Sequence, residues 1–415
     1  MKESLLKPNK KFTLLSAFIT LLNDRLSESI LLPILPSFVL LFDSKASTYG
    51  LLSCTYQLAQ FTASPFIGLM SDRYGRRPVT LFCITGSVIG ISILSFTVLF
   101  NWSNSIATIP LFLLFLARLI DGLSGGTAAT ATTILADISS PEKRAKTFGL
   151  IGVAFGLSFF LGNIFVVIFA RNTNNNFIIP VLIASIIPII NFLLVFFYLP
   201  ETKPNSDSNK SKPFIKNPLK NLFTVFKEEK IKKLSLAFFI YFIAFTGLTT
   251  ILVFFLQNSL LWSVKDSLGP LIVVGIVAIV VQGGLIGPLV KEFGEFKLTI
   301  SGTGFILFAC ALLITFPNNN SGTYIYLAVS FLAVGAGLIT PCIRALISKR
   351  IDKNSQGSIL SSLQGLQSLG SVLGYILAGN VYDYFGPRSP FFAGGLILFL
   401  MIWLITGSDI KKKLE

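Results

Sequence analysis

Apolar stretches of about twenty residues recur along the entire chain, and they constrain its fold more than any other feature. A helix needs about 20 mostly apolar residues to cross the hydrocarbon core of a bilayer. Of the 415 residues, 53% are hydrophobic and only 13% are charged, and the mean hydropathy is +0.75. A soluble domain carries about 25% charged residues. The sequence therefore predicts a protein that crosses a bilayer many times.

Turn and charge signals separate the apolar stretches into twelve predicted spans, which we expect to be helices because only helices and closed barrels satisfy their backbone polar groups in lipid. The predicted spans lie at roughly 13–41, 48–69, 79–100, 109–135, 147–169, 177–199, 234–256, 268–290, 298–316, 323–346, 357–380 and 390–407.

The 34 Lys and Arg residues are distributed unevenly between the two sides of these spans. The two termini and every second loop hold 27 of them, whereas the loops of the opposite side hold four. Cytoplasmic loops carry an excess of Lys and Arg, so we expect both termini in the cytoplasm and the protein in a plasma or inner membrane. A nucleic-acid-binding protein would instead gather these charges on one folded face. We expect the bilayer, and no nucleic acid, as a partner.

The longest polar stretch, 201–233, divides the chain into halves. It begins as an Asn-, Ser- and Pro-rich linker and ends in a mixed apolar and basic run that we expect to form a helix on an anionic membrane surface. We therefore predict an N-terminal six-helix bundle at 1–200, this cytoplasmic linker, and a C-terminal six-helix bundle at 234–415.

An internal repeat supports two related halves. Gly68 and Gly75 between the second and third spans match Gly287 and Gly294 between the eighth and ninth, each displaced by 219 residues. Duplicated halves of this kind place a substrate site at the repeat interface near the bilayer midplane. The predicted fold is an all-α membrane protein of twelve helices in two pseudo-symmetric bundles.

The most specific motif is the loop Gly68-Leu-Met-Ser-Asp72-Arg73-Tyr-Gly75-Arg76-Arg77-Pro78. Its glycines permit a tight turn between helices, and Pro78 suits the first turn of the next helix. Asp72 can accept hydrogen bonds from helix-end amides or from a neighbouring arginine. The three arginines would hold the loop at the cytoplasmic surface.

This motif closely resembles the signature of the major facilitator superfamily, and the resemblance covers the whole chain. It implies a loop that latches one conformation, a role we assign to Gly68, Gly75 and the charged residues Asp72, Arg73, Arg76 and Arg77. The sequence Ile30-Leu-Leu-Pro33-Ile-Leu-Pro36 and the sequence Leu116-Ala-Arg118-Leu-Ile-Asp121-Gly122 resemble the drug–proton antiporters of that superfamily, especially the tetracycline-efflux-like group.

Two departures from that group are visible. The antiporter motif of the fifth span would have Gly-Pro where this chain has Gly162-Asn163, and Gly-Gly where it has Val166-Val167. The third and ninth spans lack the acidic residue of a tetracycline exporter, and the chain has no histidine. We therefore do not expect tetracycline as the substrate.

Five charged residues stand away from the ends of predicted spans, where each costs several kcal/mol unless it meets a partner or a water-filled cavity. Asp24, Arg25 and Glu28 lie in the first span, and Arg118 and Asp121 in the fourth. Spacings of three and four residues place such side chains on one helix face. Three carboxylates against two arginines leave one carboxylate for a transported proton, and we expect it to be Asp24, with Glu28 next. The alternative is that all five are structural pairs, or that Asp24 lies close enough to the cytoplasmic end of its span to be solvated.

Polar, uncharged side chains within other spans are candidates for a substrate cavity, although each is about as suited to bridging helices. Together with Arg25 these candidates are Gln57, Gln282, Gln364 and Gln367. Arg344, at the end of the tenth span, is expected to extend toward the membrane surface.

These observations predict a transporter that exports small amphipathic or lipophilic compounds in exchange for protons. The alternative within transport is a proton symporter that imports a polar solute such as a sugar or organic acid. A membrane-embedded enzyme is disfavoured because the chain has no His. No nucleotide-binding loop is present, so we expect no cofactor and no metal; the partners are a small-molecule substrate and protons, and the protein is expected to be a monomer. A receptor or scaffold would not need charges at bilayer depth.

Overall fold

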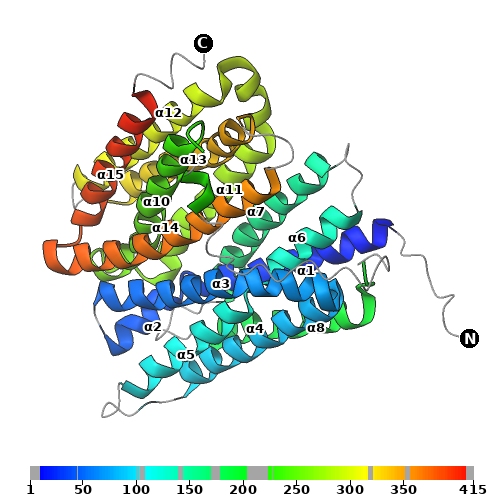
Figure 1. The fold of residues 1–415 in the computed structure, drawn as a ribbon. Coiled ribbons are helices and arrows are strands. Elements are labelled where there is room, and N and C mark those ends of the chain that lie inside the picture. The colour runs from blue at the N-terminus through cyan, green and yellow to red at the C-terminus, as the bar shows by residue number, and fades with distance from the viewer. Residues whose placement is uncertain are drawn as a thin grey trace, which may run out of the picture. The chain divides into compact units, whose positions relative to one another are not determined.

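The computed structural model describes residues 10–43, 45–100, 102, 108–138, 144–169, 178–202, 223–226, 228–315, 321–350 and 356–407. Every regular element in these ranges is a helix, which confirms the predicted all-α class (Figure 1). Seven segments are long and apolar enough, by length and composition alone, to cross a bilayer. The other spans are shorter, interrupted or more polar.

Grouped by the breaks between them, the described helices correspond to the twelve predicted spans. In chain order the spans are α1 (Lys10–Leu31) with α2 (Leu35–Phe42), α3 (Ala46–Tyr74), α4 (Arg76–Leu99), α5 (Thr108–Ser124) with α6 (Thr127–Ile138), α7 (Arg144–Phe169), α8 (Ile178–Tyr198), α10 (Lys232–Asn258), α11 (Val264–Val280) with the π-helix η3 (Val281–Leu285) and the start of α12 (Ile286–Thr315), the rest of α12, α13 (Ser321–Ser348), α14 (Gln356–Phe385) and α15 (Ser389–Thr406).

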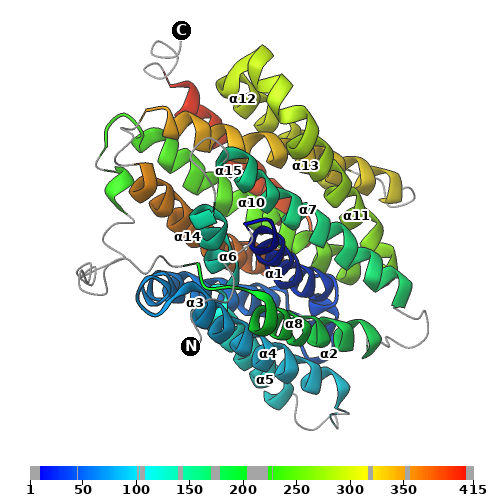
Figure 2. The same ribbon diagram turned by 90° about the vertical axis from the view of Figure 1, so that its right-hand side faces the viewer.

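The chain forms two compact units. The first contains Met1–Leu35 and Ala59–Lys216, and the second contains Pro36–Leu58 and Asn217–Glu415. In the first unit α1 packs against α6, α7 and α8, and α4 packs against α5 and α8, as Figures 1 and 2 both show. In the second unit α10 packs against α14 and α15, and α12 packs against α13. In the run at 219–233, where a surface helix is predicted, the described residues show a short 3₁₀ helix, η2 (Phe223–Phe226), and the start of α10; residues 219–222 and 227 lie outside the described part.

The first and fourth spans are each broken in two, which corrects the prediction of single helices at 13–41 and 109–135. Pro33 has no backbone N–H to continue the helical ladder, and the Ile34 N–H bonds to Leu31 O at 3.1 Å instead. In the fourth span Gly125 and Gly126 separate α5 from α6, because paired glycines are the residues least costly to take out of a helix. Both breaks lie shortly after the charged residues of their spans.

The start of the second span, α3, is held by contacts within the second unit. Asp383, near the end of α14, accepts hydrogen bonds from the backbone N–H groups of Ala46 (2.9 Å) and Ser47 (2.8 Å). These amides belong to the first turn of α3, where N–H groups have no intrahelical acceptor and a carboxylate is favoured. Close packing supports the same contact, since a Cβ on Gly50 would lie 2.4 Å from Tyr375 O.

The two glycines matched by the internal repeat adopt the same rare backbone conformation. Gly75, between α3 and α4, has φ 103° and ψ 159°, and Gly294, within α12, has φ 75° and ψ 156°. This region is essentially restricted to glycine. Each glycine turns the chain between two spans at corresponding places in the two halves, so the sequence repeat is also a repeat of backbone geometry.

The surroundings of Gly75 and Gly294 differ, so we expect substitution by Ala to lower the stability of the protein by different amounts at the two positions. A Cβ on Gly75 would lie 2.5 Å from the Glu201 carboxylate, whereas nothing lies within 4 Å of a Cβ on Gly294. We expect Gly294→Ala to lose about 1–3 kcal/mol from backbone strain alone, and Gly75→Ala to lose more. Thermal unfolding of the purified variants, followed by size-exclusion chromatography, measures both. Equal stability of the two variants would contradict the role of Glu201.

Candidate functional site

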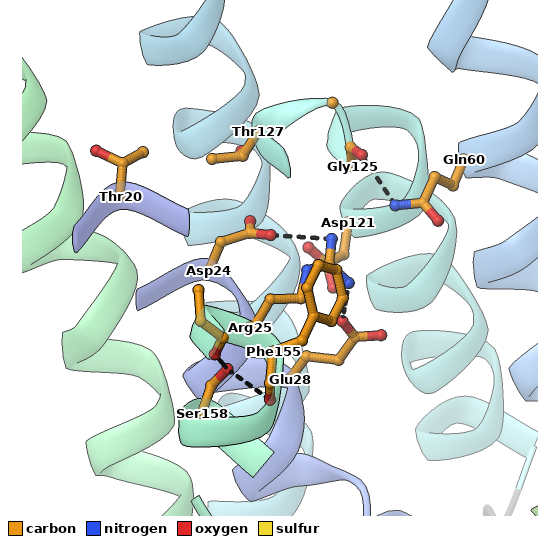
Figure 3. Close-up of polar contacts among 12 residues, drawn as sticks. Thr20, Asp24, Arg25, Glu28, Gln60, Asp121, Gly125, Thr127, Phe155 and Ser158 are labelled. Carbon is orange, nitrogen blue, oxygen red and sulfur yellow. Dashed lines mark hydrogen bonds and ion pairs between the residues drawn. The ribbon is translucent and has the colours of Figure 1, made fainter. Parts of the chain in front are cut away.

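The charged residues of the first span form a connected ion cluster (Figure 3). The Arg25 guanidinium lies between two carboxylates, with Nη2 3.0 Å from Asp24 Oδ2 and Nη1 2.5 Å from Glu28 Oε2. The other side of Arg25 stands over the ring of Phe155 on α7, 5.1 Å from its centroid. A single arginine therefore serves two carboxylates, as the i,i+3 and adjacent spacings on α1 allow.

The fourth span contributes the remaining pair. Arg118 Nη1 lies 3.7 Å from Asp121 Oδ2, and the two side chains are only 7% and 13% exposed. Asp121 packs against α4, because its Cβ lies 2.9 Å from where a Cβ on Gly90 would be. It is also close enough to Asp24 and Glu28 to interact with their charges. The structure thus brings together the five intramembrane charges that the sequence singled out.

Exposure distinguishes the three carboxylates. The side chains of Asp24 and Asp121 are each 13% exposed, whereas that of Glu28 is 34% exposed. Glu28 is therefore the carboxylate of the three that is most accessible to water. Glu28 also makes the shorter of the two contacts with Arg25. The geometry therefore leaves Asp24 as the more weakly compensated group beside the shared arginine.

The break between α5 and α6 borders this cluster. Gly125 O, released from the helical ladder at the α5–α6 break, accepts a hydrogen bond from Gln60 Nε2 at 2.9 Å. Thr127, the first residue of α6, lies beside Asp24 (Figure 3). Interrupted helices next to charged groups are a common construction of ion and substrate sites in transporters. Sequence reasoning missed Gln60 and the break, although the adjacent Gly125 and Gly126 within an apolar span were a visible signal.

The loop motif is held by a residue whose role the sequence did not reveal. Glu201, just after α8, accepts hydrogen bonds from the backbone N–H groups of Arg76 (2.8 Å) and Arg77 (3.1 Å) at the start of α4. A carboxylate at this helix N-terminus satisfies amides that have no intrahelical acceptor.

The arginines of the motif also contact neighbouring groups. Arg77 Nη2 donates to Phe196 O, and its guanidinium lies over the Phe196 ring. Arg76 Nη1 donates to Ser71 Oγ at 3.1 Å, and Arg73 lies over the ring of Tyr74. Gly68 is exposed on α3. The side chain of Asp72 lies outside the described part, and the predicted latching role of the loop stays a prediction.

The predicted cavity glutamines do not all gather in one place. Gln364 and Gln367 of α14 both accept hydrogen bonds from Arg344 of α13, at 2.9 and 2.6 Å. Gln282 is exposed on the π-helix η3, and Gln57 is half-buried on α3. Among the described residues, neither Gln57 nor Gln282 makes a side-chain hydrogen bond. Arg344 is tied to these glutamines rather than extended freely toward the membrane surface, which corrects the expectation for that residue.

Removing the shared arginine should expose the repulsion that it offsets. We expect Arg25→Gln to lower the stability by up to about 3 kcal/mol, because Asp24 and Glu28 would then face each other without a cation between them. Adding Asp24→Asn to Arg25→Gln should restore most of this loss. Thermal unfolding of the two single variants and the double variant forms the cycle that measures the coupling. Additive effects of the two substitutions would show that Arg25 and Asp24 do not interact.

Comparisons with known proteins agree with this architecture. The family model described as Major Facilitator Superfamily matches residues 16–373 and 333–414. The chain is 28% identical to the class C tetracycline resistance protein of Escherichia coli over 389 residues, covering 91% of each chain. It is 26% identical to mouse major facilitator superfamily domain-containing protein 10, covering 88% of this chain and 80% of that protein.

Solved structures share the fold. The crystal structure of the human organic anion transporter MFSD10 has a TM-score of 0.70 and 23% identity, covering 96% of this chain and 100% of that one. The xylose transporter XylE from E. coli, in a partially occluded inward-open conformation, has a TM-score of 0.73 and 14% identity, covering 96% of this chain and 98% of that one.

Proposed function

The chain belongs to the Major Facilitator Superfamily and is an integral, multi-pass membrane transporter, and we propose that it exports small amphipathic or lipophilic compounds in exchange for protons. The relatives are transporters rather than enzymes. By the uneven distribution of Lys and Arg, both termini would lie in the cytoplasm.

The observation that carries the proposal is the surplus of carboxylates in the ion cluster. Asp24 and Glu28 share Arg25, while Asp121 has Arg118 at 3.7 Å. A cluster of three carboxylates and two arginines is negative by one charge when all are ionised. In a region of low dielectric that surplus is costly, and a bound proton removes it. The cluster is therefore suited to take up and release one proton per cycle.

Asp24 is the carboxylate that we assign to the proton. It is less exposed than Glu28 and makes the longer contact with the shared arginine. Protonation of Asp24 would leave the Arg25–Glu28 pair intact, so the proton could come and go without unpairing the arginine. Arg118 and Asp121 would modulate the cluster through their charges.

A substrate that binds near this cluster in competition with the proton would give exchange by alternating access, the mechanism expected of duplicated six-helix halves. The tetracycline resistance proteins of E. coli, at 28 and 29% identity, support export over import. The absence of the fifth-span proline, where this chain has Asn163, keeps proton symport of a polar solute as the alternative.

Inverted membrane vesicles with and without the protein test this function. After energisation, a panel of lipophilic drugs and dyes is added while uptake and internal pH are followed. We expect gradient-driven uptake with matching proton release, and we expect Asp24→Asn to reduce it to the level of vesicles without the protein. Glu28→Gln should retain part of the exchange, because Asp24 remains available to the proton.

The matched control is Glu292→Gln, which removes one carboxylate charge at an exposed position on α12. It should leave the exchange unchanged. Proton-coupled uptake that survives in Asp24→Asn would contradict the assignment of the proton. If no compound of the panel moves, while a sugar or organic acid enters right-side-out vesicles together with protons, the symport alternative is correct.

A further inference from the structure

A half-buried arginine, Arg344, lies in the other unit and has a different environment. Arg344 stands four residues before the end of α13, and its guanidinium is directed toward α14. Its Nη2 donates to Gln364 Oε1 at 2.9 Å and to Gln367 Oε1 at 2.6 Å. On another side it lies over the ring of Phe238 on α10, 5.6 Å from the centroid. Three helices of one unit therefore converge on this arginine.

None of these neighbours carries a negative charge. Within the described part of the chain, no carboxylate lies within 4.0 Å of the Arg344 guanidinium. Its Nε is buried and has no hydrogen-bond acceptor among the described residues. Buried charges are normally paired, and buried N–H groups are normally bonded. Arg344 is half-buried with a buried Nε, and among the described residues it has neither a carboxylate partner nor an acceptor for that Nε.

Lys349, five residues further along the chain, shows the ordinary arrangement. Its ammonium forms an ion pair and hydrogen bond with Glu295 at the start of the ninth span. The same end of α13 thus has one cation with a carboxylate partner and one with neutral partners only. Among the described residues, the lack of a carboxylate partner is therefore a property of the Arg344 position and not of the whole region.

The groups around Arg344 are hydrogen-bond donors with spare capacity. Both glutamines use their carbonyl oxygens toward Arg344, and their amide nitrogens make no hydrogen bond to another described residue. An amide carries two N–H donors, and a guanidinium carries five in a rigid fork. The cluster therefore offers donors to an incoming group and has little acceptor capacity left.

The cluster is open on one side and apolar on the other. Gln364 is exposed and Gln367 is half-buried, whereas Phe238 is completely buried. Phe242 and Tyr241 extend this aromatic wall, with Phe242 4.9 Å from both Phe238 and Tyr241, centroid to centroid. An occupant could therefore reach the donors from the glutamine side while its apolar part rests near aromatic rings.

We propose that Arg344, Gln364 and Gln367 bind the anionic group of an organic anion, and that the compounds this transporter moves carry such a group. The proposal rests on the proposed export function for its biological meaning, but the binding step does not depend on proton coupling. A carboxylate or sulfonate would supply both the missing charge and the missing acceptors, since each presents two oxygens that can accept from the guanidinium fork together.

Equilibrium binding to the purified wild-type protein in detergent tests this site without any gradient. The probes are naphthoate, phenylbutyrate and naphthalenesulfonate, each compared with its uncharged amide or sulfonamide. We expect the anion of at least one pair to bind more tightly than its neutral analogue. In Arg344→Gln that anion should lose about 10- to 100-fold in affinity, the range for a hydrogen-bonded charge, while the neutral analogue is unaffected. Arg344→Lys should recover only part of the affinity, because it keeps the charge and loses the fork.

Lys349→Gln is the matched control, since it removes one positive charge from the same end of α13. We expect it to change the affinity by no more than about twofold, because its charge is exposed and paired. Gln364→Ala should weaken anion binding without changing the thermal stability greatly, which separates binding from a structural tie between α13 and α14.

Three results would overturn the proposal. One is the absence of a charge preference in all three probe pairs, and another is a preference that persists in Arg344→Gln. A third is displacement of the probe by chloride or inorganic phosphate at equal concentration, which would indicate a site for small inorganic ions. Asp24→Asn is included as well: it should keep anion binding while losing proton-coupled flux, so failure of this site and failure of the proposed function give different results.

Discussion

The contact on which the site depends is that of one arginine with two carboxylates on a single membrane helix. Arg25 neutralises only one of Asp24 and Glu28, and the Arg118–Asp121 pair adds no net charge. In water this imbalance would matter little, but at bilayer depth it is worth several kcal/mol. A proton on one carboxylate removes the imbalance. We propose that the uptake and release of this proton couple the cluster to a proton gradient.

The local backbone supports this arrangement. The spans that carry the charges are also the spans that break, at Pro33 in the first and at Gly125 in the fourth. The break at Gly125 releases a carbonyl that Gln60 then binds, so a polar side chain of α3 is fixed next to the cluster. The second unit differs: in its described part, the half-buried cation Arg344 contacts two neutral glutamines and an aromatic ring instead of carboxylates. Proton and substrate recognition would thus use different chemistry in the two units.

Much of this could be predicted from the sequence, because bilayer thickness and the cost of buried charge leave few solutions. The twelve spans follow from apolar length, and the repeat that links Gly75 with Gly294 correctly predicts equivalent turns. The five charges of the site follow from their position inside apolar runs. The sequence could not show which residue caps the turn at Gly75, since Glu201 is 126 positions away, nor that Arg344 meets Gln364 and Gln367. Those contacts depend on how helices pack, and spacing along the chain carries no information about them.

Infrared spectroscopy of the purified protein, titrated across neutral pH, tests the central claim most directly, because a protonated carboxyl has a C=O stretching band that a carboxylate lacks. The account predicts a protonated-carboxyl band in the wild-type protein that disappears as the pH rises and is absent from Asp24→Asn, while Glu292→Gln retains it. A wild-type protein with no such band, or a band that Asp24→Asn leaves unchanged, would contradict the assignment of the transported proton to Asp24.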